Sequence, residues 1–304
     1  MKAIEKIAII GAGAIGASYA SMFYNMSMDA VSFIAGENRY VRLKQDGIIV
    51  NGKHYNIPVY LPEHIPAPYD LVIVAVKHHH LDSAINDLQG GVGEETVILS
   101  FMNGIESEEA IGSVFSLDKV LYSVVLGIDA VREGNSTTYS NQGRVFFGEA
   151  KNVVQTDRVK QVKKLFERAG INYVVPADMI RTLWWKFMIN VGINQVSAAL
   201  RAPYKLFQAP GEARSLMDSA MREVMLLAQA QGINLIEGDI ESWHDVLSSL
   251  SPDGKTSMLQ DVEAGRKTEV EMFSGKVIEL GKRLDIATPV NEELFRTLRR
   301  IEKW

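Results

Sequence analysis

The chain has 304 residues, of which 47% are hydrophobic and 23% charged, and its formal net charge is −5. This length favours two domains, because single hydrophobic cores stop growing near about 250–300 residues, and the acidic balance argues against general binding to nucleic acid or anionic membranes. The chain has no cysteine, which excludes disulfides, thiolate metal sites and a cysteine nucleophile. The charged N-terminus and the lack of any apolar run near ~18 residues predict no signal peptide and no membrane span, so we expect a soluble, cytoplasmic protein.

Short apolar runs alternate with helical patterns over the first half of the chain. The expected helices include 14–26, 80–89 and 105–114, and the expected strands are 6–10, 30–34, 71–76, 96–101 and 120–125. The third and fourth strands are apolar on both faces, as strands of a covered parallel sheet are. The alternation predicts an α/β domain of the Rossmann type, with a doubly wound parallel sheet.

The first strand is followed by GAGAIG, residues 11–16, in which the glycines have the dinucleotide-binding spacing. In such a motif Gly11 allows a tight turn, Gly13 lets a pyrophosphate approach the backbone, and Gly16 permits close packing of helix and strand. A glycine-rich turn without a ligand is the alternative. The position between an apolar strand and a helix favours the cofactor-binding interpretation.

Two polar residues follow later strands of the same pattern. Lys77 comes directly after 71–76, and Asn103 comes shortly after 96–101. Ligands of an open parallel sheet bind outside the carboxyl ends of its strands, so we expect both residues to flank the same crevice as the glycine loop. A solvated lysine at a helix start and a plain Asn-Gly turn are the alternatives.

Two segments interrupt the parallel pattern. Asn51-Gly52 lies between β-rich runs, which is a strong hairpin signal, and residues 136–149 also predict antiparallel strands.

Between these segments, three consecutive histidines point in different directions on a helix and so do not form a metal cage. We expect no bound metal. We expect His78, His79 and His80 to be surface residues at the start of a helix.

The pattern changes after Pro176, from which point it is helical to the end. We therefore expect two domains. Residues 1–176 form the dinucleotide-binding domain, and residues 177–304 form an all-helical substrate and catalytic domain.

The helical stretch 183–200 is mostly apolar, yet Lys186, Asn190 and Asn194 recur in it every four residues. A step of four residues advances only ~40° around an α-helix, so the three line one edge. A water-facing edge is the alternative, but such an edge usually carries better helix formers than asparagine. The spacing therefore also suggests that the two asparagines form hydrogen bonds inside a cleft.

Two further polar residues stand out in the second half. Glu269 lies near the edge of an apolar helix face, where an unpaired carboxylate would be poorly solvated and a lysine partner would help. Ser257 opens the segment SMLQ, and its structural interpretation is a helix N-cap with Gln260 completing a capping box.

Together these motifs resemble the ketopantoate reductase (2-dehydropantoate 2-reductase) family over essentially the whole chain. The family reduces the ketone of ketopantoate with a nicotinamide cofactor, normally NADPH, in the pantothenate route to coenzyme A. The matching segments are IAIIGAGAIGASYA, VAVKHHHLDSAI, SFMNGIESEE, LWWKFMINVGINQVSAAL, SMLQDVEAGRKTEVEMFSG and IATPVNEEL.

The resemblance also implies roles for individual residues. Lys186 corresponds to the proton donor and Glu269 to an acidic residue at the junction of cofactor and substrate. Substrate contacts correspond to Asn190, Asn194, Ser257 and Asn103. Cofactor contacts correspond to Gly11, Ala12, Gly13, Ala14, Ile15, Gly16, Lys77, Asn103 and Glu269.

Two departures from the family pattern keep alternatives open. Gly36 stands where NADPH-using members carry an arginine; Arg39 and Arg42 follow it, whereas Glu37 could accept hydrogen bonds from the ribose of NAD. NADPH is thus the expected cofactor and NADH the alternative. Tyr204 stands where a substrate-side asparagine is expected.

Three functions remain in competition at this point. The first is ketopantoate reduction, the second is an NAD-dependent D-2-hydroxyacid dehydrogenase that acts on another 2-keto acid, and the third is a non-catalytic nicotinamide-binding sensor. The expected partner is a small-molecule 2-keto acid rather than nucleic acid or membrane, and the helical domain offers a surface for a homodimer.

Overall fold

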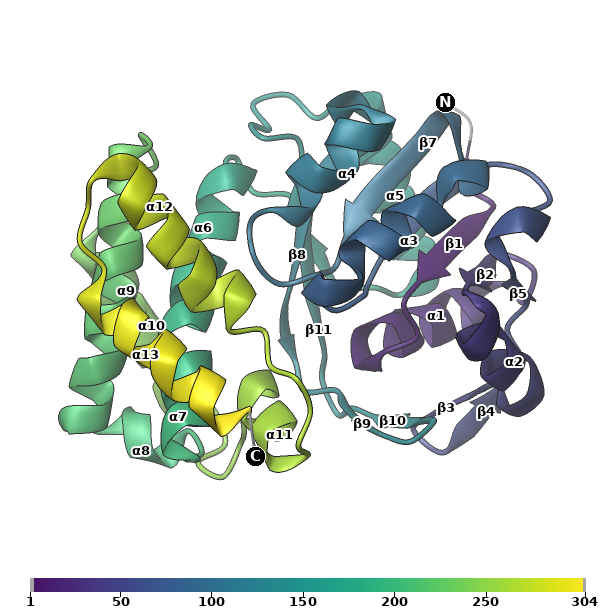
Figure 1. Cartoon of the computed structure of the whole chain (residues 1–304). Coiled ribbons are helices and arrows are strands. Elements are labelled where there is room, and N and C mark those ends of the chain that lie inside the picture. The colour runs from purple at the N-terminus through teal and green to yellow at the C-terminus, as the bar shows by residue number, and fades with distance from the viewer. Residues whose placement is uncertain (1–2, 303–304) are drawn as a thin grey trace. The chain divides into compact units, whose positions relative to one another are not determined.

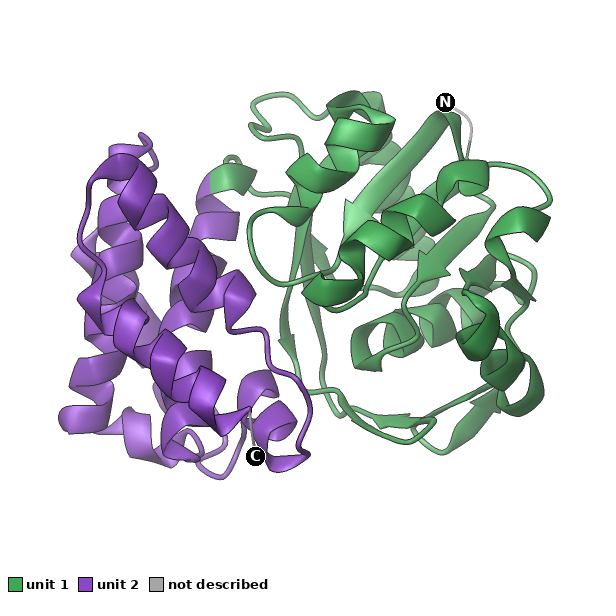
Figure 2. Cartoon of the chain, viewed as in Figure 1, with its two compact units in different colours: residues 1–180 green, residues 181–304 purple. Residues whose placement is uncertain are grey.

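The computed structural model describes residues 3–302. The chain divides into two compact units, residues 1–180 and residues 181–304, shown in different colours in Figure 2. Within the described range, no helix combines the length and the apolar character needed to cross a membrane.

Unit 1 contains an eight-stranded sheet (Figure 1). Its strands are β1 (Ile7–Ile10), β2 (Val31–Ile34), β5 (Val59–Tyr60), β6 (Tyr69–Val74), β7 (Val92–Ser100), β8 (Val120–Ile128), β11 (Gln142–Gly148) and β12 (Tyr173–Val174). They lie in the order β12-β11-β8-β7-β6-β1-β2-β5. The pairs from β5 to β8 are parallel, whereas β11 runs antiparallel to β8. The strand order reverses at β1, which has β2 on one side and β6 on the other.

Helices cover both faces of this sheet. They are α1 (Ala14–Met26), α2 (Glu37–Asp46), α3 (Leu81–Asp87), α4 (Ser107–Phe115) and α5 (Asp157–Ala169). Successive residues of β1 point to opposite faces, so Ile7 and Ile9 pack with α1 and α5 while Ala8 and Ile10 pack with α3 and α4. The doubly wound α/β fold expected from the alternating pattern is confirmed.

A second, four-stranded sheet was only partly foreseen. It contains β3 (Ile48–Val50), β4 (Lys53–Tyr55), β9 (Val131–Glu133) and β10 (Ser136–Thr138), in the order β4-β3-β10-β9. Asn51 and Gly52 both have positive φ, +50° and +78°, and join β3 to β4 in the expected hairpin. The segment 136–149 does form antiparallel strands, but it is shared between the two sheets because β10 pairs with β9 and β11 with β8.

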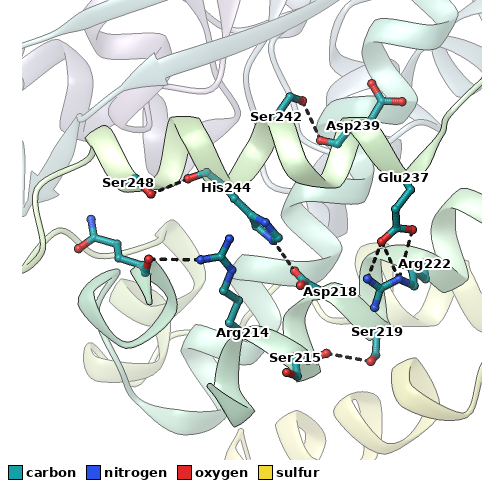
Figure 3. Close-up of polar contacts among 11 residues, drawn as sticks. Arg214, Ser215, Asp218, Ser219, Arg222, Glu237, Asp239, Ser242, His244 and Ser248 are labelled. Atoms are coloured by element: carbon teal, nitrogen blue, oxygen red, sulfur yellow. Dashed lines mark hydrogen bonds and ion pairs between the residues drawn. The ribbon is translucent and has the colours of Figure 1, made fainter. Parts of the chain in front are cut away.

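The described residues of unit 2 form helices and connecting loops, as the sequence predicted. The elements are α6 (Met179–Ile189), η5 (Asn190–Asn194), α7 (Gln195–Leu200), α8 (Lys205–Gln208), α9 (Glu212–Ala230), α10 (Glu237–Ser249), α11 (Ser257–Glu263), η6 (Glu271–Gly275), α12 (Lys276–Leu284) and α13 (Pro289–Ile301). Polar contacts join α9 to α10 (Figure 3): Arg222 pairs with Glu237, and His244 lies 2.8 Å from Asp218. The turns η5 and η6 are π-helical.

Candidate functional site

The turn between β1 and α1 requires two of its three glycines for packing. Gly11 has φ +104°, and a Cβ on it would lie 2.4 Å from the carbonyl oxygen of Ala75. A Cβ on Gly16 would lie 1.8 Å from the carbonyl oxygen of Gly11. Gly13 differs, because the nearest atom to its Cβ position is 4.0 Å away. The space in front of Gly13 is therefore open for a ligand to approach the backbone.

The start of α1 is suited to an anion. Gly13 is the N-cap residue and supplies no side-chain cap, and the first turn contains no acidic residue. The first N–H groups of a helix lack intrahelical partners, and the helix dipole adds positive potential there. A phosphate group is the usual ligand of such a terminus. The residues present thus fit the pyrophosphate of a dinucleotide.

The structure brings the other predicted cofactor residues of unit 1 to the same edge of the sheet. Ile10 of β1 is in register with Val74 of β6, which is in register with Ser100 of β7. Lys77 and Asn103 each follow one of these strand ends, and both are half-buried. Neighbouring strands therefore present the glycine loop, Lys77 and Asn103 together at their carboxyl ends, where this fold binds ligands.

A buried polar ring closes the base of the loop that carries Asn103. Ser100 Oγ and Ser107 Oγ are 2.7 Å apart, Ser107 donates to Glu108 Oε2 at 2.9 Å, and the Ser123 hydroxyl donates to the Ser100 carbonyl at 2.7 Å. Burial raises the pKa of Glu108 to about 7, against the lowering effect of these hydrogen bonds. Glu108 was not predicted as a buried group, because acidic residues such as Glu108 are equally common at the exposed start of a helix.

In unit 2, Lys186 lies on α6, and Asn190 and Asn194 lie in the π-helical turn that follows. Asn190 is 5% exposed and Asn194 is 7% exposed, so the asparagine edge does not face water. The predicted continuous α-helix is wrong over these residues, since the hydrogen-bonding pattern widens between α6 and α7. Short π-turns within helices occur frequently at functional sites.

A buried amide network holds this π-turn in place. The Gln195 side chain donates to the Val191 carbonyl at 2.8 Å and to Asn291 Oδ1 at 3.1 Å, and it accepts from the Ser274 backbone N–H at 3.1 Å. Asn291 in turn donates to Glu223 Oε2 at 2.7 Å. The network joins η5 to η6 and α13, and no local sequence pattern predicted it.

Asn194 and Ser257 meet, with 3.5 Å between Nδ2 and Oγ. The N-cap interpretation of Ser257 is wrong, because Thr256 caps α11 by accepting from the Leu259 N–H at 3.1 Å. Ser257 is the first residue of the helix, and its side chain is exposed. Its hydroxyl is therefore available to a ligand.

The Lys186 amine and the Glu269 carboxylate interact electrostatically. Glu269 is 7% exposed and lies in the bend before η6. Burial lowers the pKa of Lys186 to about 8, and the charge of Glu269 opposes that shift. An amine with this pKa is mostly protonated at neutral pH and gives up its proton more readily than an ordinary lysine, which is what general acid catalysis needs.

Tyr204 lies against the loop that leads to Ser257. Its backbone N–H donates to the Gly254 carbonyl at 3.0 Å, and a Cβ on Gly254 would lie 2.9 Å from the Tyr204 ring. Burial raises the pKa of the Tyr204 hydroxyl. An aromatic ring thus lies beside Gly254, three residues before Ser257, at the position where the sequence resemblance implies an amide.

Two family models match the chain. Residues 7–152 match the model of ketopantoate reductase PanE/ApbA, and residues 178–302 match that of the ketopantoate reductase PanE/ApbA C-terminal region. A 2-dehydropantoate 2-reductase from Pyrococcus horikoshii is 27% identical over 94% of this chain and 94% of its own.

Solved structures agree with this match. The 2-dehydropantoate 2-reductase from Geobacter metallireducens is 27% identical, with a TM-score of 0.85 over 97% of this chain and 99% of its own. A D-mandelate dehydrogenase, solved with NADH and anilino(oxo)acetate, is 22% identical, with a TM-score of 0.89 over 98% of each chain. This second likeness concerns the fold.

Proposed function

The chain belongs to the ketopantoate reductase family, and from that premise we propose that it reduces 2-dehydropantoate to pantoate with NADPH, in pantothenate biosynthesis. At the coarser level it is an NAD(P)H-dependent oxidoreductase that acts on a 2-keto acid. The proposal adds the substrate, the preferred cofactor and the roles of the site residues.

The observation that carries the proposal is the environment of Lys186. Its pKa is lowered to about 8, it interacts with the buried Glu269, and buried Asn190 follows it by one helical turn. A sensor that only binds the cofactor does not need a lysine tuned in this way. These groups support catalysis over the sensor function.

The bound cofactor would supply a hydride to the carbonyl carbon. In the proposed mechanism the protonated Lys186 amine donates a hydrogen bond and then a proton to the ketone oxygen, which becomes negative as the transition state forms. Asn190 orients the ketone, while Asn194 and Ser257 hold the substrate carboxylate. Glu269 keeps the amine charged enough to act as the acid.

The proposed cofactor residues belong to unit 1. The backbone N–H groups of residues 13–16 hold the pyrophosphate, Lys77 supplies positive charge at the end of β6, and Asn103 positions the nicotinamide end. The open space at Gly13 and the shared edge of β1, β6 and β7 support these roles.

A second candidate function is supported by Tyr204. An aromatic ring on the loop that leads to Ser257 would suit a 2-keto acid with a bulkier or aryl side chain, reduced with NADH. A panel of ketopantoate, pyruvate, 2-oxoisovalerate and phenylglyoxylate, each with NADPH and NADH, tests both functions. We expect the largest kcat/KM with ketopantoate and NADPH. A larger value for phenylglyoxylate would refute the ketopantoate assignment and favour the second candidate.

A further inference from the structure

Three arginines of unit 1 interact electrostatically with one another, and none of them has a carboxylate partner among the described residues. Arg39 and Arg42 lie in the first turns of α2, three residues apart and so on neighbouring positions of one face. Arg132 comes from β9, far along the chain. Across residues 3–302, none of the three forms an ion pair; Arg42 Nε donates to the Asn38 carbonyl at 3.4 Å and Arg132 Nε to the Gly134 carbonyl at 2.9 Å.

The sheet register explains how Arg132 reaches this place. Thr137 of β10 pairs with Val50 of β3, which follows α2, and Arg132 lies opposite Thr137 in the β9–β10 ladder. Opposite residues of an antiparallel pair share one face of the sheet. Thr137 is fully buried, so the Arg132 side chain lies on the inward face. The next residue, Glu133, lies on the opposite face and is exposed.

Arg132 has an energetically unfavourable environment in the absence of a ligand. Its Nη1 atom is buried and has no hydrogen-bond partner among the described residues, and a buried donor without an acceptor is unfavourable. Burial lowers the pKa of its guanidinium, and the charges of Arg39 and Arg42 lower it further. An anion with several acceptor oxygens would relieve both the unsatisfied donor and the mutual repulsion.

The position of the cluster suggests which anion. α2 follows β2, and β2 ends beside β1 because Ile34 is in register with Ile10. In this fold the adenosine ribose of a dinucleotide lies at that point, where an acidic residue accepts the 2′-hydroxyl of NAD or an arginine accommodates the 2′-phosphate of NADP.

Both kinds of group are present near this position. Glu37 is exposed at the start of α2, and Asp87 Oδ2 lies 3.9 Å from the Cβ position of Gly36. These two carboxylates would favour a ribose hydroxyl. Against them stand three guanidinium groups, which match a phosphate dianion in charge and in hydrogen-bonding geometry.

We propose that Arg132, acting with Arg39 and Arg42, binds a phosphate monoester, and that in this protein the monoester is the 2′-phosphate of NADPH. Arg132 thereby replaces the arginine that the sequence lacks at Gly36. The inference rests on the proposed function only in requiring that unit 1 binds a nicotinamide dinucleotide.

The test is equilibrium binding, which does not depend on turnover. Titrations compare NADPH with NADH, and adenosine 2′,5′-bisphosphate with adenosine 5′-monophosphate, because each pair differs only in the 2′-phosphate. Inorganic phosphate is added as a competitor to separate binding of the adenine nucleotide from binding of any phosphate. The variants are Arg132→Ala, Arg132→Lys, the double variant Arg39→Ala with Arg42→Ala, and Arg144→Ala. Arg144 is an exposed arginine of β11 and serves as the matched control.

We expect wild type and Arg144→Ala to bind NADPH at least about tenfold more tightly than NADH, and the bisphosphate at least about tenfold more tightly than the monophosphate. Arg132→Ala should lose that preference while binding NADH and the monophosphate as before, and Arg132→Lys should keep part of it. The double variant should reduce the preference while leaving Arg132 in place. Equal affinity of wild type for NADPH and NADH would overturn this inference together with the proposed preference for NADPH. An unchanged preference in Arg132→Ala would overturn this inference alone, as would displacement of the bisphosphate by inorganic phosphate at equal concentration. If neither dinucleotide bound, the proposed function would fail with it.

Discussion

Asn194 and Ser257 are 63 residues apart in the chain, yet the amide nitrogen of one lies 3.5 Å from the hydroxyl oxygen of the other. The contact joins the π-turn of the lysine helix to the first residue of α11. It places a donor amide and an exposed hydroxyl at one point, as the proposed carboxylate-binding role requires.

The first prediction therefore contrasts Ser257 with its neighbour Thr256. Ser257→Ala should raise KM for the keto acid about 10- to 100-fold and change kcat less, because a hydrogen bond to a charged group contributes ~1.5–3 kcal/mol. Thr256→Ala removes the N-cap, which costs ~1 kcal/mol of stability. It should lower the melting temperature and leave KM near wild type. The reverse pattern in steady-state kinetics and thermal melts would show that Ser257 is structural.

The second prediction concerns the pH dependence of reduction. The Lys186 amine must be protonated to act as the acid, and its pKa is lowered to about 8. Since kcat/KM reports the free enzyme, log kcat/KM should be flat below pH 8 and fall with a slope near −1 above it. The Glu269 charge raises this pKa, so Glu269→Gln should move the break to lower pH. An unshifted break in Glu269→Gln would argue against their coupling.

The third prediction separates packing glycines from a ligand-facing glycine. A Cβ on Gly16 would overlap the Gly11 carbonyl, whereas one on Gly13 meets its nearest atom at 4.0 Å. Gly16→Ala should destabilise the fold by ~1–3 kcal/mol, as overpacking does. Gly13→Ala should melt like wild type and bind NADPH at least about tenfold more weakly. Thermal melts and fluorescence titration measure the two effects; tight binding by Gly13→Ala would exclude its pyrophosphate role.

The fourth prediction concerns the buried ring at Glu108. Its pKa is raised from 4.5 to about 7 in the folded state, so the folded protein holds a proton that the unfolded chain has released. The contribution of protonated Glu108 to the free energy of unfolding is fully present below pH about 4.5 and is lost as the pH rises to about 7. The loss amounts to ~3 kcal/mol. Glu108→Gln should remove this part of the slope in urea unfolding between pH 5 and 8. An identical slope in wild type and variant would exclude this titration.

Much of unit 1 was predictable because its signals are local. The segments that form β6 and β7 have apolar runs typical of strands in a covered parallel sheet, and the Asn51-Gly52 turn predicted its hairpin. The division of residues 131–148 between two sheets depends on pairing with distant strands. No local pattern contains that information.

The site was predictable in its residue types and less so in its geometry. The four-residue spacing of Lys186, Asn190 and Asn194 was visible, but the π-turn depends on long-range bonds from Gln195 to Ser274 and Asn291. The N-cap of α11 is Thr256 and not Ser257. The sequence did not distinguish them, because both hydroxyl residues suit an N-cap position locally. Arg132 gave no signal at all, because only the sheet register brings it to α2.

Whether Lys186 is the proton donor in ketopantoate reduction can be tested by the initial rates of wild type, Lys186→Ala and Lys282→Ala with NADPH. Lys282 is an exposed lysine of α12 and controls for loss of a surface charge. We predict rapid turnover by wild type and Lys282→Ala, and a ~10²–10⁴-fold lower kcat in Lys186→Ala with cofactor binding preserved. A Lys186→Ala variant as fast as wild type, or a wild type without turnover, would contradict the proposed function.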